Sequence, residues 1–169
     1  MLDNQAVMQK DNGLTRLCCR STAIGMIGIA ERGGALRNLY FMEKSGDSII
    51  ETVSTPLLEE AFMQLDAWLA GRLNTFSLPI VAEGSGFGQR VWKSLSEIQY
   101  GSTTSYGKVA EALGLPGAAR AVGSACGRNP LPIIIPCHRV ICSDGQIGGY
   151  LGGADKKRYL LDLERRNRE

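Results

Sequence analysis

Apolar and polar residues alternate in short runs over the first third of the chain. Between Leu14 and Ser54 the runs LTRLCCR, AIGMIGIAE, LRNLYFME and SIIETVS are separated by turn residues, of which Arg32-Gly33-Gly34 is one group. Alternation with a period of two is typical of strands that bury one face. The pattern therefore predicts a small antiparallel sheet.

The spacing of the apolar residues changes after residue 54. Thr55-Pro56 is a favourable helix start, apolar residues then recur at helical spacing from Leu57 to Leu69, and Gly71 follows them. This spacing predicts one helix that packs on the sheet. The first half of the chain is therefore expected to be α+β.

The segment FSLPIVAEGSGFG, residues 76–88, is rich in glycine, proline and serine and is the best candidate linker. The charge changes sign there: residues 1–85 carry 7 Lys+Arg against 10 Asp+Glu, a net −3, and residues 86–169 carry 12 against 7, a net +5. We therefore predict two domains, 1–85 and 86–169. The basic excess of the second favours a polyanionic partner, although a solvated surface would give the same count.

The second half is predicted to be mainly helical. One helix is expected to begin near Phe87 and to stop at Tyr100-Gly101. Thr104 is then predicted to cap a short helix that ends at Gly114, and Pro116 to open another that reaches about Cys126. Two short helices across a tight turn form a helix-turn-helix, a geometry that also occurs in proteins that do not bind DNA.

The last of these helices consists mostly of glycine and alanine, with Arg120 as the only long side chain before its end. Such a helix can pack tightly on a neighbour, or it can present a smooth surface to DNA. The basic excess favours DNA. We expect DNA contacts from Arg120, Ala118, Ala119, Gly123 and Arg128.

Composition excludes several protein classes. Hydrophobic residues make up 44% of the chain and charged residues 21%, which is ordinary for a globular protein. No apolar run reaches the roughly 18 residues of a membrane helix, and the start of the chain lacks the features of a signal peptide. We expect a cytoplasmic protein with no membrane partner.

The cysteines do not form a metal-binding pattern. There are five of them and one histidine, and no pair of C-x-x-C motifs occurs, so no metal site is expected. Cys18 and Cys19 should point to opposite faces of a strand and are expected to be reduced structural residues.

The stretch IIIPCHRV places Cys137 directly before His138. The surrounding sequence predicts two apolar strands around Pro136, followed by a turn at Asp144-Gly145. A free thiol is only a few per cent thiolate at neutral pH, so a nucleophilic cysteine needs a base or a positive field. Adjacent strand residues face opposite ways, so a Cys137–His138 contact needs a turn in the backbone or a bridging water. A buried structural cysteine remains the alternative.

A third group should orient the imidazole. The C-terminal segment DKKRYLLDLERRNRE offers Asp155, Asp162 and Glu164. Glu164 can lie at the edge of the apolar face of this helix, or it can be a surface partner of Lys157 or Arg168.

The motifs PCHRV, residues 136–140, and GGYLGG, residues 148–153, resemble the O6-alkylguanine-DNA alkyltransferase (methylated-DNA–protein-cysteine methyltransferase) family. The resemblance extends from about Phe87 to Glu164 through VWKSLSEI, TTSYGKVAEALG, RAVGSACGRNP and KKRYLLDLE. The N-terminal half resembles the family only in its layout, a small sheet with a helix, and in FSLPI. The resemblance implies a ribonuclease H-like N-terminal domain and a C-terminal winged helix-turn-helix domain.

The resemblance further implies a DNA repair protein, a monomer without cofactor, that acts on double-stranded DNA containing O6-alkylguanine. It would flip the damaged base out of the duplex and transfer the alkyl group irreversibly, once per molecule, to Cys137. His138 would act as the base through a water, and Glu164 would orient His138.

Other roles follow only from the resemblance. Asn129 would brace the reactive turn, Tyr106 would donate a proton to the departing guanine, and Arg120 would fill the gap left by the base. The predicted substrate-binding residues are Val140, Tyr150 and Pro136.

Two other functions are weighed against this one. A non-catalytic helix-turn-helix module that recognises damaged DNA is disfavoured because Cys137 is retained. A cysteine hydrolase would need an oxyanion hole, which nothing in the sequence specifies. Cys126 stands where the family commonly has asparagine.

Overall fold

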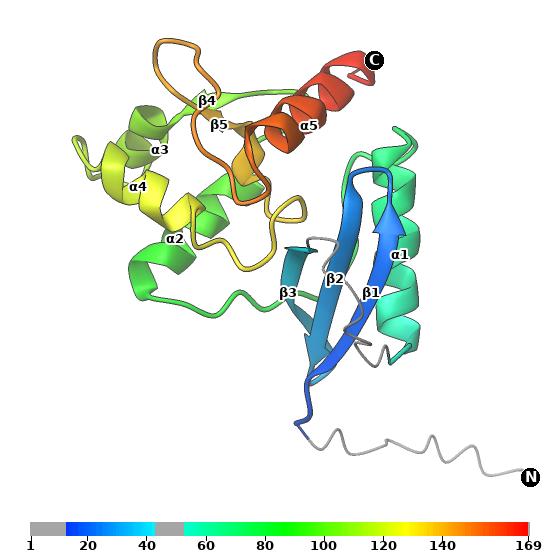
Figure 1. Cartoon of the computed structure of the whole chain (residues 1–169). Helices are drawn as coiled ribbons and strands as arrows, with labels where there is room; N and C mark the ends of the chain where they lie inside the picture. Colours follow the sequence, from blue (N-terminus) through cyan, green and yellow to red (C-terminus); the bar gives the residue numbers. More distant parts are fainter. Residues whose placement is uncertain (1–12, 43–52, 169) are drawn as a thin grey trace, which may run out of the picture.

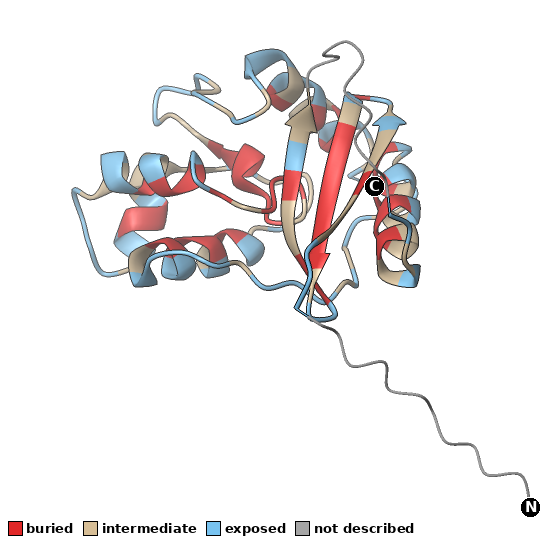
Figure 2. Cartoon of the chain, turned by 60° about the horizontal axis from the view of Figure 1, so that its bottom comes forward, coloured by how far each residue is buried: buried red, intermediate tan, exposed pale blue. Residues whose placement is uncertain are grey.

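The computed structural model describes residues 13–42 and 53–168. Three strands, β1 Arg16–Thr22, β2 Gly25–Arg32 and β3 Ala35–Met42, form an antiparallel sheet in the order β1-β2-β3. Gly33 and Gly34 both adopt positive φ in the turn between β2 and β3, a conformation that glycine accepts without strain. The central strand β2 is buried along most of its length (Figure 2).

The predicted small antiparallel sheet is thus confirmed for its first three strands. The fourth run, residues 48–54, lies almost entirely outside the described residues. At its end, the backbone N–H of Val53 donates to the carbonyl of Leu17 at 3.1 Å. Cys18 is 1% exposed whereas Cys19 is half-buried, as expected for neighbours on opposite faces of a strand.

Helix α1, Pro56–Leu69, packs against β2 and β3 (Figure 1). The Thr55 hydroxyl caps it by accepting from the backbone N–H of Leu58, and Gly71 at φ 70° follows its end. The predicted helix is therefore confirmed at both ends. Its buried face consists of Leu58, Ala61, Phe62, Leu65, Trp68 and Leu69.

The segment after α1 joins the sheet to the second half of the chain. Leu36 on β3 donates to the carbonyl of Pro79 at 2.8 Å, and its own carbonyl accepts from Val81 at 2.9 Å. Farther along β3, the N–H of Leu39 donates to the carbonyl of Pro130 at 2.8 Å. The edge of β3 is therefore covered by residues from both sides of the predicted boundary.

The second half contains four α-helices: α2 Gly86–Ser96, α3 Tyr106–Ala112, α4 Ala119–Cys126 and α5 Ala154–Arg166. A two-stranded parallel sheet pairs β4, Thr104–Ser105, with β5, Val140–Ile141, and a 3-10 turn, η1 Cys137–Arg139, precedes β5. Figure 1 shows α2, α3 and α4 together on the side of the molecule away from α1. The described residues thus form an α+β fold with a small three-stranded sheet and five α-helices, as predicted.

Two helix starts differ from the prediction. Ser105, not Thr104, caps α3, because Thr104 pairs with Val140 in the β4–β5 sheet. Helix α4 begins at Ala119 rather than Pro116, because Gly117 has φ 90°, which no α-helix contains.

The prediction of two apolar strands around Pro136 is wrong. Only the two residues of β5 are a strand there, and Ile133 has a positive φ of 75°. Pro132 and Pro136 lack the N–H groups that a strand ladder requires, so the chain forms tight turns instead. The predicted turn at Asp144-Gly145 is present, with Gly145 donating to the carbonyl of Cys142 at 3.0 Å.

Candidate active site

The 3-10 turn η1 presents Cys137 and His138 in a conformation that no strand would give them. Asn129, 3% exposed, braces the chain before this turn. Its amide Nδ2 donates to the carbonyl of Ile135 at 2.8 Å, and its Oδ1 accepts from the N–H of Leu131 at 3.0 Å. The predicted brace therefore contacts the segment that leads into the reactive turn.

His138 and Glu164 form a buried pair. The ring Nε2 of His138 lies 2.9 Å from Oε1 of Glu164, and the two side chains are 0% and 1% exposed. Because a carboxylate only accepts hydrogen bonds, Nε2 carries the hydrogen and Nδ1 is left as the basic nitrogen. Nδ1 is buried, and no hydrogen bond to it occurs within the described residues.

Arg139 also binds the Glu164 carboxylate. Its Nε lies 3.0 Å from both oxygens of Glu164, its Nη2 lies 2.8 Å from Oε1, and its Nη1 donates to the carbonyl of Ile98 at 2.5 Å. The N–H of Gly101 also donates to Oε2 at 2.9 Å. Burial alone would raise the pKa of Glu164, but the hydrogen bonds from His138 and Arg139 outweigh it and lower that pKa to about 2.

The thiol of Cys137 opens into a cavity of about 480 Å³. Side chains of several chemical kinds line it, namely Cys126, Cys137, Cys142, Tyr106 and Tyr150, together with glycines such as Gly123 and Gly148. A side chain on Gly148 would meet Tyr106 Oη at 3.0 Å and Cys142 Sγ at 3.3 Å. Glycine at this position therefore keeps the cavity open.

A buried lysine reaches the rim of this cavity. Lys157 on α5 is 0% exposed, and its Nζ donates to the carbonyls of Val140 and Gly149 at 2.7 and 3.2 Å. Nζ also lies 3.4 Å from the hydroxyl of Tyr106. The site thus contains an amino group next to a phenol, and burial lowers the pKa of Lys157.

The resting protonation states follow from burial. Burial raises the pKa of Cys137 to about 11, even though the side chain of Asn129 and the charge of Lys157 act to lower it. Burial also lowers the pKa of His138, and the hydrogen bond that its Nε2 donates to Glu164 opposes this shift. At neutral pH the site therefore holds a neutral thiol beside a neutral imidazole.

Tyr106 is a phenol at neutral pH. Burial is the main cause that raises the pKa of this residue to about 12, and the neighbouring Cys126, Cys142 and Cys137 act in the same direction. Tyr106 therefore keeps its proton at neutral pH and presents a hydrogen-bond donor inside the cavity.

The predicted DNA-facing residues differ in exposure. Arg120 and Arg128 are exposed, whereas Ala118, Ala119 and Gly123 are half-buried. A Cβ added at Gly123 would lie 3.8 Å from the ring of Tyr106, which is an ordinary van der Waals distance.

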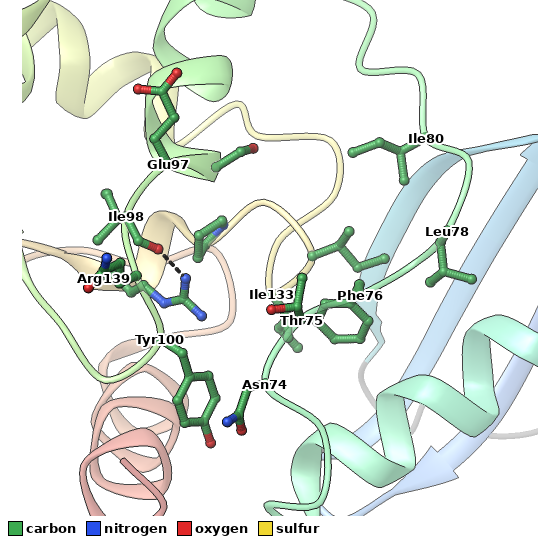
Figure 3. A pocket seen from close by; sticks show the side chains of 14 residues that line it. Asn74, Thr75, Phe76, Leu78, Ile80, Glu97, Ile98, Tyr100, Ile133 and Arg139 are labelled. Carbon is green, nitrogen blue, oxygen red and sulfur yellow. Dashed lines mark hydrogen bonds between the residues drawn. The ribbon is translucent and has the colours of Figure 1, made fainter. Parts of the chain in front are cut away.

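A second cavity, of about 340 Å³, is lined by residues at both ends of η1, Pro136 and Arg139. Figure 3 shows Tyr100, Phe76 and Arg139 around it. Pro136, predicted to bind substrate, lines this second cavity and not the first. Val140, also predicted to bind substrate, is fully buried in β5, and of the three only Tyr150 lines the cavity of Cys137.

Three residues of the site were not singled out in the sequence. Lys157 lies three residues before Leu160, and Glu164 lies four residues after it. This spacing places all three side chains on one face of α5, so the sequence pattern could have predicted that Lys157 is buried. Arg139 follows the Cys-His pair directly, and its positive charge beside a candidate nucleophile was the signal that could have identified it. Trp68, whose ring centroid lies 5.8 Å from that of His138, carries no signal because it is distant in the chain.

No group of three or more potential metal ligands occurs among residues 13–42 and 53–168. Over the same ranges, no helix is long and apolar enough to cross a membrane. All five cysteines are described, and none is in a disulfide.

Comparison with known proteins shows the family. Residues 86–166 match the family of the 6-O-methylguanine DNA methyltransferase, DNA binding domain. The methylated-DNA–protein-cysteine methyltransferase of Mycobacterium bovis is 46% identical over 145 residues, which cover 84% of this chain and 87% of the relative. The constitutive enzyme of that name from Bacillus subtilis is 42% identical over 151 residues, 85% and 92% of the two chains.

Solved structures agree with these matches. The crystal structure of Mycobacterium tuberculosis OGT in complex with DNA superposes with a TM-score of 0.81 at 43% identity, over 90% of this chain and 94% of that chain. With this degree of identity along most of its length, the chain belongs to the methylated-DNA–protein-cysteine methyltransferase family.

Proposed function

We infer that this protein repairs DNA by transferring the alkyl group of O6-alkylguanine from duplex DNA to its own Cys137, irreversibly and once per molecule. One observation supports the assignment of this reaction to Cys137, His138 and Glu164. A buried cysteine opens into a cavity beside a neutral histidine whose far nitrogen is bonded to a buried carboxylate. This arrangement supports proton removal from a thiol that would otherwise stay protonated.

In the proposed reaction, His138 Nδ1 takes the thiol proton of Cys137, directly or through a bridging water. The thiolate sulfur then attacks the alkyl carbon, the C–S bond forms, and the bond from carbon to O6 breaks. Tyr106 gives a proton to the departing guanine, so that guanine leaves as a neutral base. Glu164 stabilises the imidazolium that forms, and no cofactor takes part.

The product explains why each molecule would act once. The cysteine ends as a thioether, and neither His138 nor any other basic group can regenerate a thiol from it without cleaving a C–S bond.

The DNA partner is proposed from the OGT–DNA crystal structure and from the character of α4. We place α4 against the duplex, with Arg120 filling the gap left by the extruded base and Arg128 contacting phosphate. Ala118, Ala119 and Gly123 would allow the close approach. An alkylated guanine pairs poorly, so its extrusion costs only a few kcal/mol.

Several broader features stay part of the proposal. The sheet with α1 is compatible with a ribonuclease H-like domain over 1–85, and β4 and β5 beside α3 and α4 with a winged helix-turn-helix over 86–169. We propose that the protein is a monomer. We also propose that it is located in the cytoplasm, because none of its five cysteines forms a disulfide.

Intact-mass spectrometry tests the function. After incubation with excess duplex containing O6-methylguanine, each protein should gain one methyl group, on the peptide that carries Cys137. Cys137→Ser should bind the same duplex and gain none. Repeated turnover, or a methyl group on another cysteine, would overturn the assignment.

A further inference from the structure

The plane of the His138 ring is held by more than its hydrogen bond. A bond from Nε2 to Glu164 fixes one corner of the imidazole, and hydrogen bonds at a carboxylate tolerate a wide range of ring tilts. The direction of Nδ1, the nitrogen needed for proton removal, therefore depends on what packs against the ring.

Two aromatic rings pack against it. The centroid of Trp68 lies 5.8 Å from that of His138 with an interplanar angle of 77°, and the centroid of Tyr150 lies 6.4 Å away with an angle of 83°. Both are edge-to-face contacts, the geometry that aromatic pairs prefer. Two near-perpendicular rings confine the tilt of the imidazole.

Both of these rings are anchored in the N-terminal half. Trp68 lies on α1, is 0% exposed, and stacks on Phe76 at 6.1 Å and 23°. Tyr150 contacts Phe41 of β3 at 5.6 Å and 60°. The imidazole in the second half is therefore confined by side chains that the first half holds in place.

The Trp68 ring is also tied to the network around Glu164. It makes an edge contact with Tyr100 at 6.0 Å, and the guanidinium of Arg139 lies 5.7 Å from the centre of the Tyr100 ring. Figure 3 shows Tyr100, Phe76 and Arg139 arranged around the second cavity. A displacement of Trp68 would thus change the position of the His138 ring both directly and through Tyr100 and Arg139.

Unpaired polar atoms set this cluster apart from an ordinary apolar core. In the described part of the chain, four buried side-chain atoms make no hydrogen bond, and all four belong to these rings: Trp68 Nε1, Tyr100 Oη, His138 Nδ1 and Tyr150 Oη. Buried polar atoms without a protein partner are uncommon in folded proteins, and an ordered water or a functional role can account for them. Phenylalanine would fill such positions without that cost.

We propose that Trp68 is a positioning residue for the reaction: its ring, held by the N-terminal half, fixes the plane of His138 so that Nδ1 faces the thiol of Cys137. This inference rests on the proposed function of Cys137. It assigns the N-terminal half a part in the chemistry, beyond a structural one.

The test compares three variants of the full chain. Trp68→Leu removes the ring, and Trp68→Phe restores an aromatic edge without the indole N–H. Phe62→Leu is the matched control, because Phe62 is a buried aromatic residue of the same helix, with the guanidinium of Arg20 over its ring and no ring contact to His138. Transfer is measured as the rate of methylation of folded protein in a single turnover.

We expect Trp68→Leu to slow transfer about 10-fold to 100-fold, because small misplacements of a catalytic group have effects of this size. Trp68→Phe should recover most of the rate, and Phe62→Leu should leave it unchanged while lowering the melting temperature. Equal rates in Trp68→Leu and Phe62→Leu would make Trp68 a core residue only.

A second readout does not depend on transfer. His138 is the only histidine of the chain, so its ¹⁵N ring signals can be read without ambiguity. Wild type and Phe62→Leu should show narrow ring signals with hydrogen on Nε2. Trp68→Leu should keep this tautomer, because the bond to Glu164 remains, but its ring signals should broaden because the tilt of the imidazole is no longer confined. An unchanged spectrum in Trp68→Leu would overturn the positioning role. If the wild type fails to transfer a methyl group, the proposed function is wrong, but the spectrum still reports whether Trp68 orients His138.

Discussion

Burial shifts the pKa values of Cys137 and His138, the two side chains proposed to react, in opposite directions. It raises the pKa of Cys137 to about 11 and lowers that of His138 below its usual 6.5, so both groups are neutral between those limits. A neutral pair can pass a proton internally without exchanging one with the solvent. The rate of transfer should therefore be insensitive to pH over the neutral range.

This argument predicts the pH profile of a variant without the base. In wild type the rate should stay level from pH 9 down past 6.5, and fall only where the depressed pKa of His138 is reached. In His138→Gln, reaction requires direct ionisation of the thiol, so the rate should rise about tenfold per pH unit over the same range. Single-turnover rates at several pH values measure both. A wild-type rate that climbs steeply between pH 7 and 9 would contradict the internal transfer.

A second residue-scale prediction concerns Arg139. Arg139→Leu would leave the Glu164 carboxylate buried without its permanent cation, which typically costs about 3–5 kcal/mol of unfolding free energy. The control is Arg158→Leu, which breaks an exposed pair with Asp155 and should change stability by less than about 1 kcal/mol. Urea denaturation at pH 7 measures both. Equal small losses would mean that Glu164 is stabilised mainly by other groups.

At the scale of elements, the glycine-rich loop before α5 forms one wall of the reactive cavity. Gly148 and Gly145 both adopt positive φ, but a Cβ would meet Tyr106 and Cys142 at Gly148 and nothing within 4 Å at Gly145. Gly148→Ala and Gly145→Ala should each lose about 1–2 kcal/mol through backbone strain. Only Gly148→Ala should also slow transfer, since its methyl group enters the cavity. If both variants transfer at the wild-type rate, the loop does not define the space for the base.

Helix α4 offers a different prediction through its exposed Arg120. If Arg120 fills the gap left by the base, Arg120→Ala should chiefly slow the repair of duplex DNA and affect single-stranded substrate less. Arg128→Ala, removing a phosphate contact, should weaken binding of both and lower the salt slope by about one unit. Transfer rates and binding at several salt concentrations separate the two. A uniform loss in Arg120→Ala with a shallower salt dependence would make it a phosphate contact as well.

How far the sequence predicts these elements depends on how local each signal is. Helix α1 was predictable to its ends because Thr55, Pro56 and Gly71 act on adjacent backbone. The turn at Cys137 was not predictable, because the apolar residues around it follow a strand-like pattern. The only signal for a turn is that two nearby prolines have no N–H group to give to a strand ladder. Thr104 was mistaken for a cap because its pairing with Val140, 36 positions away, has no local mark. The contact of Trp68 with His138 is hidden for the same reason.

On the scale of the whole molecule, the two halves share one core. The hydrophobic cluster runs from Ile27 and Trp68 in the first half to Leu131 and Leu160 in the second. The backbone hydrogen bond from the N–H of Leu39 to the carbonyl of Pro130 reinforces the contact between the two halves. The boundary predicted near residue 85 therefore marks a change in the sequence pattern, whereas the residues on its two sides pack into one core.

We accordingly expect a single cooperative unfolding transition. Far-ultraviolet circular dichroism reports mainly on the helices, whereas tryptophan fluorescence reports on Trp68 in the first half and Trp92 in the second. Both should give the same urea midpoint and the same m-value. A Trp92→Phe variant, in which fluorescence reports Trp68 alone, should keep the two probes coincident. Two separated midpoints would show that the halves unfold independently.

The depth of Cys137 also bears on how long an unused molecule survives. Its side chain is only 3% exposed and holds its proton at neutral pH, so peroxides and soluble electrophiles meet a shielded thiol instead of a reactive thiolate. For an enzyme with many turnovers such losses would be tolerable, but a protein that reacts once is lost with its first stray encounter. Under the proposed function, the same burial that makes the cysteine slow to ionise keeps each copy in reserve until a damaged base enters the cavity.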